Sequence, residues 1–228
     1  MHHVQFAERA AYLADADALV VSDLHIGRDE QSAVTLPVGE REDLYQRLAT
    51  HLDRFEPATV VFAGDVLHDF RGASVATSQS LERLASVCRE AGADPRLVVG
   101  NHDPLLPSVW SGETHDAIEL QDGTVVCHGH AEPDAGGTRY VVGHDHPVIE
   151  FEGTRRPCFL WGPEEYRGAD LLMLPSFTRL AAGVPIDRLA ADGFQSPLVT
   201  DADALQPIVI DENEPLRFPP IGELRSIL

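Results

Sequence analysis

The sequence contains no lysine. All 17 of its basic residues are arginine, and 37 aspartate and glutamate residues bring the formal net charge to −20. Lysine is normally among the commonest residues, so its absence is a compositional feature in its own right. The sequence also lacks any run of about 18 apolar residues, which a membrane span needs, and it lacks a basic-then-apolar signal peptide. We therefore expect a soluble, cytoplasmic protein.

The acidic composition has two interpretations. The first is a surface that repels nucleic acid and attracts cations or basic partners. The second is adaptation to molar salt, where the screening length falls to about 3 Å and a dense carboxylate shell costs little self-repulsion. An acidic patch for one partner would not require the loss of lysine from the whole chain. The missing lysine therefore favours a high-salt cytoplasm.

Cysteine is also scarce. Cys88, Cys127 and Cys158 form an odd set without a close pair, so neither a disulfide framework nor a cysteine-type zinc site is expected. Each lies among apolar residues and is expected to be a small buried hydrophobe. The length of 228 residues and the 43% hydrophobic content suit one globular domain over residues 1–228.

The first half of the chain alternates short apolar runs with amphipathic stretches. This pattern predicts strands at 18–21, 59–63 and 97–99, and helices at 40–55 and 80–91. Such alternation implies a mostly parallel sheet. In the second half we expect a second sheet packed on the first, with strands at 117–120, 124–127, 140–142, 148–152, 158–161 and 171–174. Residues 181–228 give little to assign.

Polar, metal-capable residues cluster where these strands end. They form five segments, which together hold seven of the eleven histidines: 23–25 (Asp-Leu-His), 64–68 (Gly-Asp-Val-Leu-His), 100–103 (Gly-Asn-His-Asp), 128–130 (His-Gly-His) and 143–146 (Gly-His-Asp-His). Ligands bind at the carboxyl ends of strands in open α/β sheets, so we expect the segments to meet there. The glycines before Asp65, Asn101 and His144 would allow backbone turns that a Cβ would obstruct.

The donor types in these segments predict a two-metal site. Carboxylate oxygens and imidazole nitrogens without thiolates suit manganese, iron or zinc. A shared carboxylate can hold two cations about 3.5–4 Å apart and generate a hydroxide nucleophile at neutral pH. Each segment alone also has a structural interpretation, because an aspartate at a strand end is often a helix N-cap. His-Gly-His alone could be a solvated turn. The five segments together, in this order, favour the metal site.

The order of these motifs resembles that of the calcineurin-like metallophosphoesterases. Within that superfamily, residues 23–27 and 64–68 are most similar to the archaeal SbcD-related nucleases and the ligase-associated phosphoesterases. The resemblance implies an αββα sandwich of two mixed sheets flanked by helices. It also implies hydrolysis of phosphoesters by a metal-bridging hydroxide with two divalent ions. Manganese is expected, with iron, zinc and nickel as alternatives.

The resemblance also assigns roles to individual residues. It implies that Asp23, His25 and His146 bind the first metal, that Asn101, His128 and His144 bind the second, and that Asp65 bridges them. His102 would protonate the leaving oxygen, with Asp103 accepting a hydrogen bond from it. His68 matches a histidine that contacts the scissile phosphate in the SbcD-like nucleases, and His130 receives no role.

The substrate class is less sharply defined. The metal centre would have a net charge of about +1, from two divalent cations, the carboxylates of Asp23 and Asp65 and a hydroxide. A phosphodiester neutralises this charge, whereas a monoester dianion exceeds it. No basic patch with aromatics supports nucleic acid, although an open groove flanked by Arg28, Arg71 and Arg139 would favour a nuclease. A pocket for one nucleotide would favour a small-molecule phosphodiesterase. A phosphomonoesterase or a non-catalytic metal-binding scaffold of the same fold is the alternative.

Overall fold

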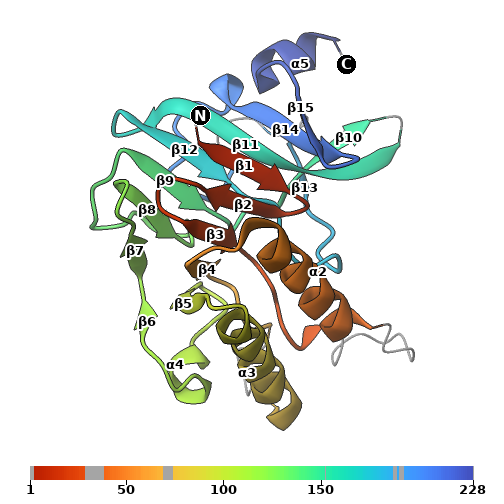
Figure 1. The fold of residues 1–228 in the computed structure, drawn as a ribbon. Helices are drawn as coiled ribbons and strands as arrows, with labels where there is room; N and C mark the ends of the chain where they lie inside the picture. Colours follow the sequence, from red (N-terminus) through yellow and green to blue (C-terminus); the bar gives the residue numbers. More distant parts are fainter. Residues whose placement is uncertain are drawn as a thin grey trace.

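The first of two β-sheets carries the amino-terminal half of the chain (Figure 1). The structure is a computed structural model and describes residues 3–28, 39–68, 74–151, 153–186, 189 and 193–227. Strands β1, β2 and β3 are antiparallel neighbours, and β3 to β6 run parallel. Their bounds in sheet order are β1 (Val4–Ala7), β2 (Ala10–Leu13), β3 (Ala18–Val21), β4 (Thr59–Ala63), β5 (Asp94–Val98) and β6 (Thr114–His115).

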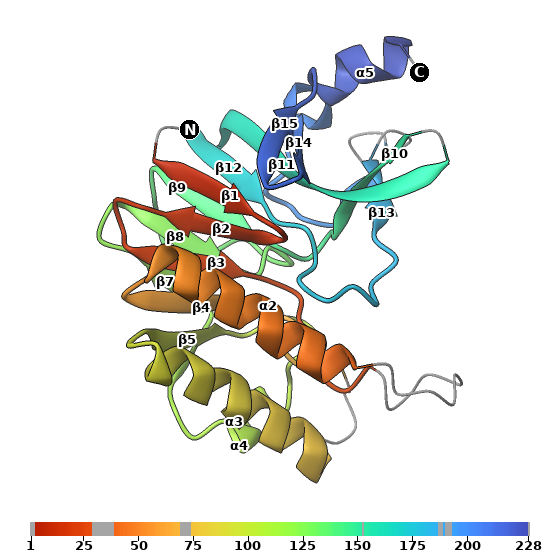
Figure 2. The same cartoon turned by 45° about the vertical axis from the view of Figure 1, so that its right-hand side comes forward.

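Helices cover the outer face of this sheet. Helix α2 (Glu40–Phe55) and helix α3 (Val75–Glu90) lie side by side in both views (Figures 1 and 2), and the short α4 (Leu106–Val109) follows β5. The leucines of α2 at positions 44, 48 and 52 are buried against the sheet, as their helical spacing requires. Helix α3 begins five residues before the predicted start, because the Ser74 side chain caps the backbone N–H of Thr77.

Within the described residues, the second sheet has nine strands. Its main path runs β13-β10-β11-β12-β9-β8-β7, and β14 joins it through β11 and carries β15. Strand β9 pairs in parallel with both β8 and β12, whereas the hairpins of the sheet are antiparallel. The bounds are β7 (Ala117–Glu119), β8 (Thr124–Cys127), β9 (Arg139–Val142), β10 (Pro147–Phe151), β11 (Thr154–Tyr166), β12 (Ala169–Met173), β13 (Val184–Pro185), β14 (Gln206–Asp211) and β15 (Glu214–Arg217).

The two sheets pack face to face. Val20 and Val61 of the first sheet and Val126 and Phe159 of the second belong to one buried cluster. A separate cluster lies between the first sheet and its helices. The outer face of the second sheet is covered more thinly, by the 3₁₀ helix η3 (Ala202–Ala204), helix α5 (Ile221–Ile227) and the loops between them. The predicted arrangement of two mixed sheets flanked by helices is thereby confirmed.

Most predicted strands are present with small shifts at their ends. Strands β3, β4 and β8 and helix α2 have the predicted bounds, and β5 starts three residues early. The strand predicted at 148–152 is β10, and its last predicted residue lies outside the described residues. The hairpin β1–β2 and the carboxyl-terminal elements β14, β15 and α5 were not predicted. In the described part of the chain, none of the helices is long and apolar enough to span a membrane.

Candidate metal centre

All five polar segments follow strands at the same edge of the two sheets. Asp23, Asp65 and Asn101 follow β3, β4 and β5 of the first sheet, and His128 and His144 follow β8 and β9 of the second. The carboxyl ends of these parallel strands point to one side, which is where side chains from several strands can meet. The site is therefore built jointly by both halves of the chain.

One group of donors forms around Asp23. The donor atoms of Asp23, His25, Asp65 and His146 all lie within 4.8 Å of one another. His146 Nε2 is 3.0 Å from Asp23 Oδ1 and 3.3 Å from His25 Nε2. His25 Nε2 is 4.0 Å from Asp65 Oδ2. The structure therefore brings together the residues expected around the first metal.

A second group forms around His128. Its Nε2 is 3.1 Å from Asn101 Oδ1 and 3.3 Å from Asp65 Oδ1. The rings of His128 and His144 make a T-shaped contact, with an interplanar angle of 74° and centroids 5.0 Å apart. Asp65 thus presents Oδ1 to this group and Oδ2 to the group around Asp23, as a bridging carboxylate would. The His130 ring lies beside the second group, with its centroid 5.3 Å from that of His128.

The two other predicted histidines border the first group. The Nε2 of His102 is 3.9 Å from Asp65 Oδ2, and its backbone N–H donates a 2.9 Å hydrogen bond to Asp65 Oδ1. About one third of the His102 side chain is exposed, so it can reach a bound molecule. The rings of His102 and His68 both stand edge-on to the His25 ring, with centroids 5.5 and 5.6 Å away.

Backbone amides bind the carboxylate of Asp103. Its fully buried carboxylate accepts hydrogen bonds from the backbone N–H groups of Val66 (3.0 Å), Leu67 (2.7 Å) and Gly100 (3.0 Å). Three amide donors leave the carboxylate committed to the backbone. Asp103 therefore ties the loop after β4 to the loop after β5, and so holds Asp65 beside Asn101.

The charges in the site are strongly coupled. Burial alone would raise the pKa of Asp23, but the neighbouring histidines, led by His146, hold it below the usual range. Burial lowers the pKa of His25 to about 4, so this ring is a neutral donor at neutral pH. Burial would also lower the pKa of His128, but Asp65 and Asp23 outweigh it and raise the pKa to about 9.

The donor chemistry fits bound cations. His128 Nδ1 lies 3.1 Å from the carbonyl oxygen of Ala63, and only its N–H form can make that hydrogen bond. In the neutral ring, Nε2 then carries a lone pair and faces two more acceptors, Asn101 Oδ1 and Asp65 Oδ1. Converging lone pairs repel one another unless a proton or a metal ion lies between them. A backbone carbonyl that fixes the ring in this way is typical of metal-ligating histidines.

The backbone of the site is unusual. Five of the seven candidate ligands have left-handed φ angles: Asp23 (58°), His25 (48°), Asp65 (49°), His144 (73°) and His146 (48°). Residues with a Cβ avoid this region, and those held there cluster at functional sites. Neither composition nor periodicity in the sequence signalled this geometry.

Two glycines of the motifs are required because neighbouring atoms approach them closely, rather than because the backbone turns there. A Cβ on Gly143 would lie 1.8 Å from Ser22 Oγ and 2.4 Å from Asp23 Oδ2. A Cβ on Gly100 would lie 2.2 Å from the Asp65 backbone nitrogen. Neither glycine has a left-handed φ, so the predicted turn is not the reason for them.

Three supporting residues were missed by the sequence analysis. Ser22 Oγ donates to Asp23 Oδ2 (2.7 Å), and Ser176 Oγ donates to the backbone carbonyl of Asp23 (2.8 Å). The buried Asp145 turns away from its histidine neighbours and accepts hydrogen bonds from the backbone of residues 195 and 196. Ser22 and Asp145 could have been suspected from their place in the motifs, but Ser176 lies far from every motif.

One of the three arginines that would flank an open groove lies away from the metal centre. Arg139 lies at the amino end of β9, opposite the end that leads to His144, and its guanidinium is 3.6 Å from the Asp122 carboxylate. It therefore cannot flank the metal centre. Arg71 lies outside the described residues. A cavity of about 670 Å³ beside His128 and His130 is lined instead by carboxylates, at Asp116, Glu119, Glu132 and Asp134.

A comparison with protein families identifies the fold. The family model described as calcineurin-like phosphoesterase matches residues 17–179, which is most of the chain and includes all seven candidate ligands. The chain belongs to the calcineurin-like phosphoesterase family. This family assignment makes the chain a metal-dependent phosphoesterase, and two divalent ions are typical of the family.

Two solved structures are similar to the chain. The chain is similar to the Pseudomonas putida nuclease MPE, with 23% identity, a TM-score of 0.65 and coverage of 92% of each chain. It is also similar to Yfce, a phosphoesterase from E. coli, with 19% identity and a TM-score of 0.44 over 86% of this chain and 88% of that one. A search of curated proteins gave no match.

Proposed function

We propose that the chain is a dinuclear metal-dependent phosphodiesterase. The observation that supports this most directly is the position of Asp65, whose Oδ2 faces His25 and whose Oδ1 faces His128. Asp23, His25 and His146 would hold one divalent ion, and Asn101, His128 and His144 the other. A carboxylate shared by two donor groups is what a pair of metals about 3.5–4 Å apart requires.

Individual residues of the chain would then have separate roles in the reaction. Bound cations would supply positive charge for the phosphoryl oxygens and lower the pKa of a coordinated water. The His102 side chain is about one third exposed beside the site, and its Nε2 would deliver a proton to the leaving oxygen. The hydrogen bond from its backbone N–H to Asp65 Oδ1 anchors the backbone of His102 beside the metal centre. His68 would contact a phosphoryl oxygen.

A diester suits this centre better than a monoester. Two divalent ions against the charges of Asp23 and Asp65 leave a small positive excess, which a phosphodiester anion and the nucleophile can neutralise. The carboxylates around the adjoining cavity would repel a second charge on the substrate. We place manganese first among the metals because the donors are carboxylate, amide and imidazole.

The natural substrate is either nucleic acid or a small diester. The fold shared with a P. putida nuclease supports the first, and so does the resemblance of residues 23–27 and 64–68 to the SbcD-related and ligase-associated enzymes. The cavity of about 670 Å³ beside His128 supports the second, because its size suits one nucleotide. Both substrates use the same metal centre and the same proton donor.

Hydrolysis assays test the proposal. Wild type should hydrolyse bis(p-nitrophenyl) phosphate, single-stranded DNA or double-stranded DNA in Mn²⁺ at high KCl. His102→Ala should lose 10²–10⁴-fold in kcat, the range for a general acid, and still bind metal. His3→Ala, at an exposed position remote from the motifs, is the matched control. Metal-loaded wild type that cleaves no phosphoester would instead identify a non-catalytic scaffold.

A further inference from the structure

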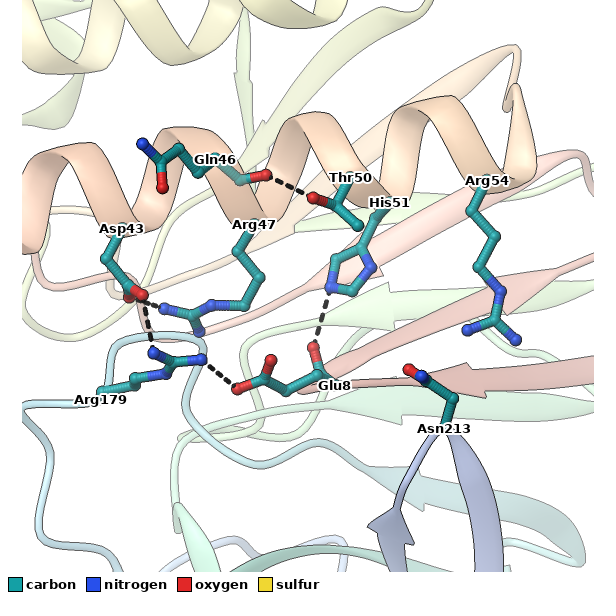
Figure 3. A pocket seen from close by; sticks show the side chains of 9 residues that line it. All are labelled: Glu8, Asp43, Gln46, Arg47, Thr50, His51, Arg54, Arg179 and Asn213. Carbon is teal, nitrogen blue, oxygen red and sulfur yellow. Dashed lines mark hydrogen bonds and ion pairs between the residues drawn. The ribbon is translucent and has the colours of Figure 1, made fainter.

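A second cluster of charged side chains lies away from the metal centre, around a cavity of about 610 Å³ (Figure 3). Asp43 of α2 lies between the guanidinium groups of Arg47 and Arg179, which it pairs with. Arg179 also contacts Glu8, in the turn between β1 and β2, at 2.8 Å. The cluster therefore joins three segments that are distant in the sequence.

The segment that this cluster holds is the loop after β12. Arg9 Nη1 donates to the carbonyl oxygens of Ser176 (2.6 Å) and Thr178 (3.2 Å). Arg47 Nη1 donates to the carbonyl oxygen between them, that of Phe177, and the Arg47 guanidinium lies over the Phe177 ring. Two guanidinium groups thus bind three successive carbonyls of residues 176–178.

The other polar groups of the same loop contact the first metal-binding segment. Phe177 N–H donates to the carbonyl oxygen of Ser22 (2.7 Å), and Thr178 N–H donates to that of Asp23 (3.3 Å). Ser176 Oγ donates to the same Asp23 carbonyl (2.8 Å). The loop therefore lies between the two arginines and the backbone of Asp23, a ligand whose own φ is left-handed.

The arginines act in a poorly solvated environment. Arg47 is 6% exposed, and burial together with the nearby Arg47 charge lowers the pKa of Arg9 to about 10. Placing two cations together out of water has a cost that their carboxylate partners only partly offset, so such groups contribute little net stability. The main effect of the two arginines is therefore expected on the geometry of the loop that they bind.

We infer that Arg9 and Arg47 are positioning residues for the metal centre, which hold residues 176–178 against Ser22 and Asp23 and so set the metal affinity. This inference rests on the proposed function, because it presumes that Asp23 binds a cation. Contacts outside the ligand shell typically change metal affinity by about 10–100-fold when removed. A change of that size is expected here, although both guanidinium groups contact the loop rather than the donors.

Metal titration of the apoprotein tests the inference. Calorimetric titration with Mn²⁺, well below the melting temperature of each variant, should show about 10–100-fold weaker binding at one site for Arg9→Met and Arg47→Met. Arg47→Lys should recover only part of the lost metal affinity. A single ammonium group cannot bind both Asp43 and the Phe177 carbonyl in the way that the planar guanidinium does. Arg54→Met is the control, because Arg54 lines the same cavity and stacks on Phe55.

Hydrogen exchange supplies a readout that needs no metal. The amides of Phe177 and Thr178 should exchange faster in Arg9→Met and Arg47→Met than in wild type or Arg54→Met. Wild-type affinity in a folded Arg9→Met variant would overturn the inference and leave the proposed function intact. Wild type that binds no divalent ion would overturn both. If Arg47→Met fails to fold, Arg9→Met decides, because it leaves the Arg47–Asp43 pair in place.

Discussion

At the scale of single residues, the metal centre combines strained backbone with tight packing. Left-handed φ angles at five candidate ligands each cost about 1–3 kcal/mol, so the surrounding contacts must over-determine their conformation. Several such contacts converge on Asp23: Ser22 on its carboxylate, and Ser176 and Thr178 on its carbonyl. The donor positions are therefore set before any metal binds.

Gly143 is the most sensitive of the packing positions. Gly143→Ala should displace Asp23 or Ser22, because the new Cβ would lie 1.8 Å from Ser22 Oγ. We expect a loss of at least tenfold in Mn²⁺ affinity and about 1–3 kcal/mol of stability from overpacking. Gly136→Ala is the matched control, since a Cβ there meets nothing within 4 Å. Equal metal affinities of the two variants would show that Gly143 is not needed for close approach.

At the scale of elements, the continuous apolar runs were predictable and the mixed ones were not. The β-branched runs of β3 and β4 and the leucine spacing of α2 were predicted at their observed bounds. The hairpin β1–β2 was missed because β1 has a glutamine among its apolar residues and β2 begins with two alanines, which have low strand propensity. Strand β14 has Pro207 as its second residue, and proline has low strand propensity.

Helix α2 carries a testable pH dependence. His51 is buried, its Nε2–H donates to the carbonyl oxygen of Glu8 (2.9 Å), and its charged surroundings are Glu8, Arg47 and Arg54. Burial, the largest cause, lowers its folded-state pKa below the unfolded value of about 6.5. Below about pH 6.5 the unfolded chain therefore binds a proton that the folded chain does not, and stability falls as the pH falls.

The measurement is the free energy of unfolding by urea between pH 7 and pH 5. His51→Gln keeps a donor for the Glu8 carbonyl without titrating, so its stability should fall less steeply than that of wild type. The difference should reach at most about 1.4 kcal/mol per pH unit. His3→Gln is the control for removing an exposed histidine. Parallel curves for His51→Gln and wild type would contradict the role given to burial.

At the scale of the whole molecule, the sequence predicted where the site forms but not what supports it. Five motifs at strand ends were enough to place seven candidate ligands at one edge of two sheets. The supporting contacts from residues 176–178 and the buried arginines were not predictable, because they join segments more than 120 residues apart. Long-range packing of this kind leaves no periodic signal in the sequence.

The net charge of −20 gives a prediction for the whole molecule. At low ionic strength the exposed carboxylates repel one another, and surface ion pairs with arginine offset little of this. Molar KCl screens the repulsion to about 3 Å. The melting temperature should therefore rise from millimolar to molar KCl, by roughly 2–4 °C for each kcal/mol gained. An unchanged melting temperature would contradict salt adaptation.

The most direct test of the metal centre is the number of metal ions bound per chain. Protein reconstituted with Mn²⁺, freed of excess metal and measured by elemental mass spectrometry should hold two ions. Asp65→Ala should hold fewer than two, because Asp65 faces both donor groups, whereas His130→Ala should keep both. Wild type with fewer than two ions, or Asp65→Ala that retains two, would contradict a centre bridged by Asp65.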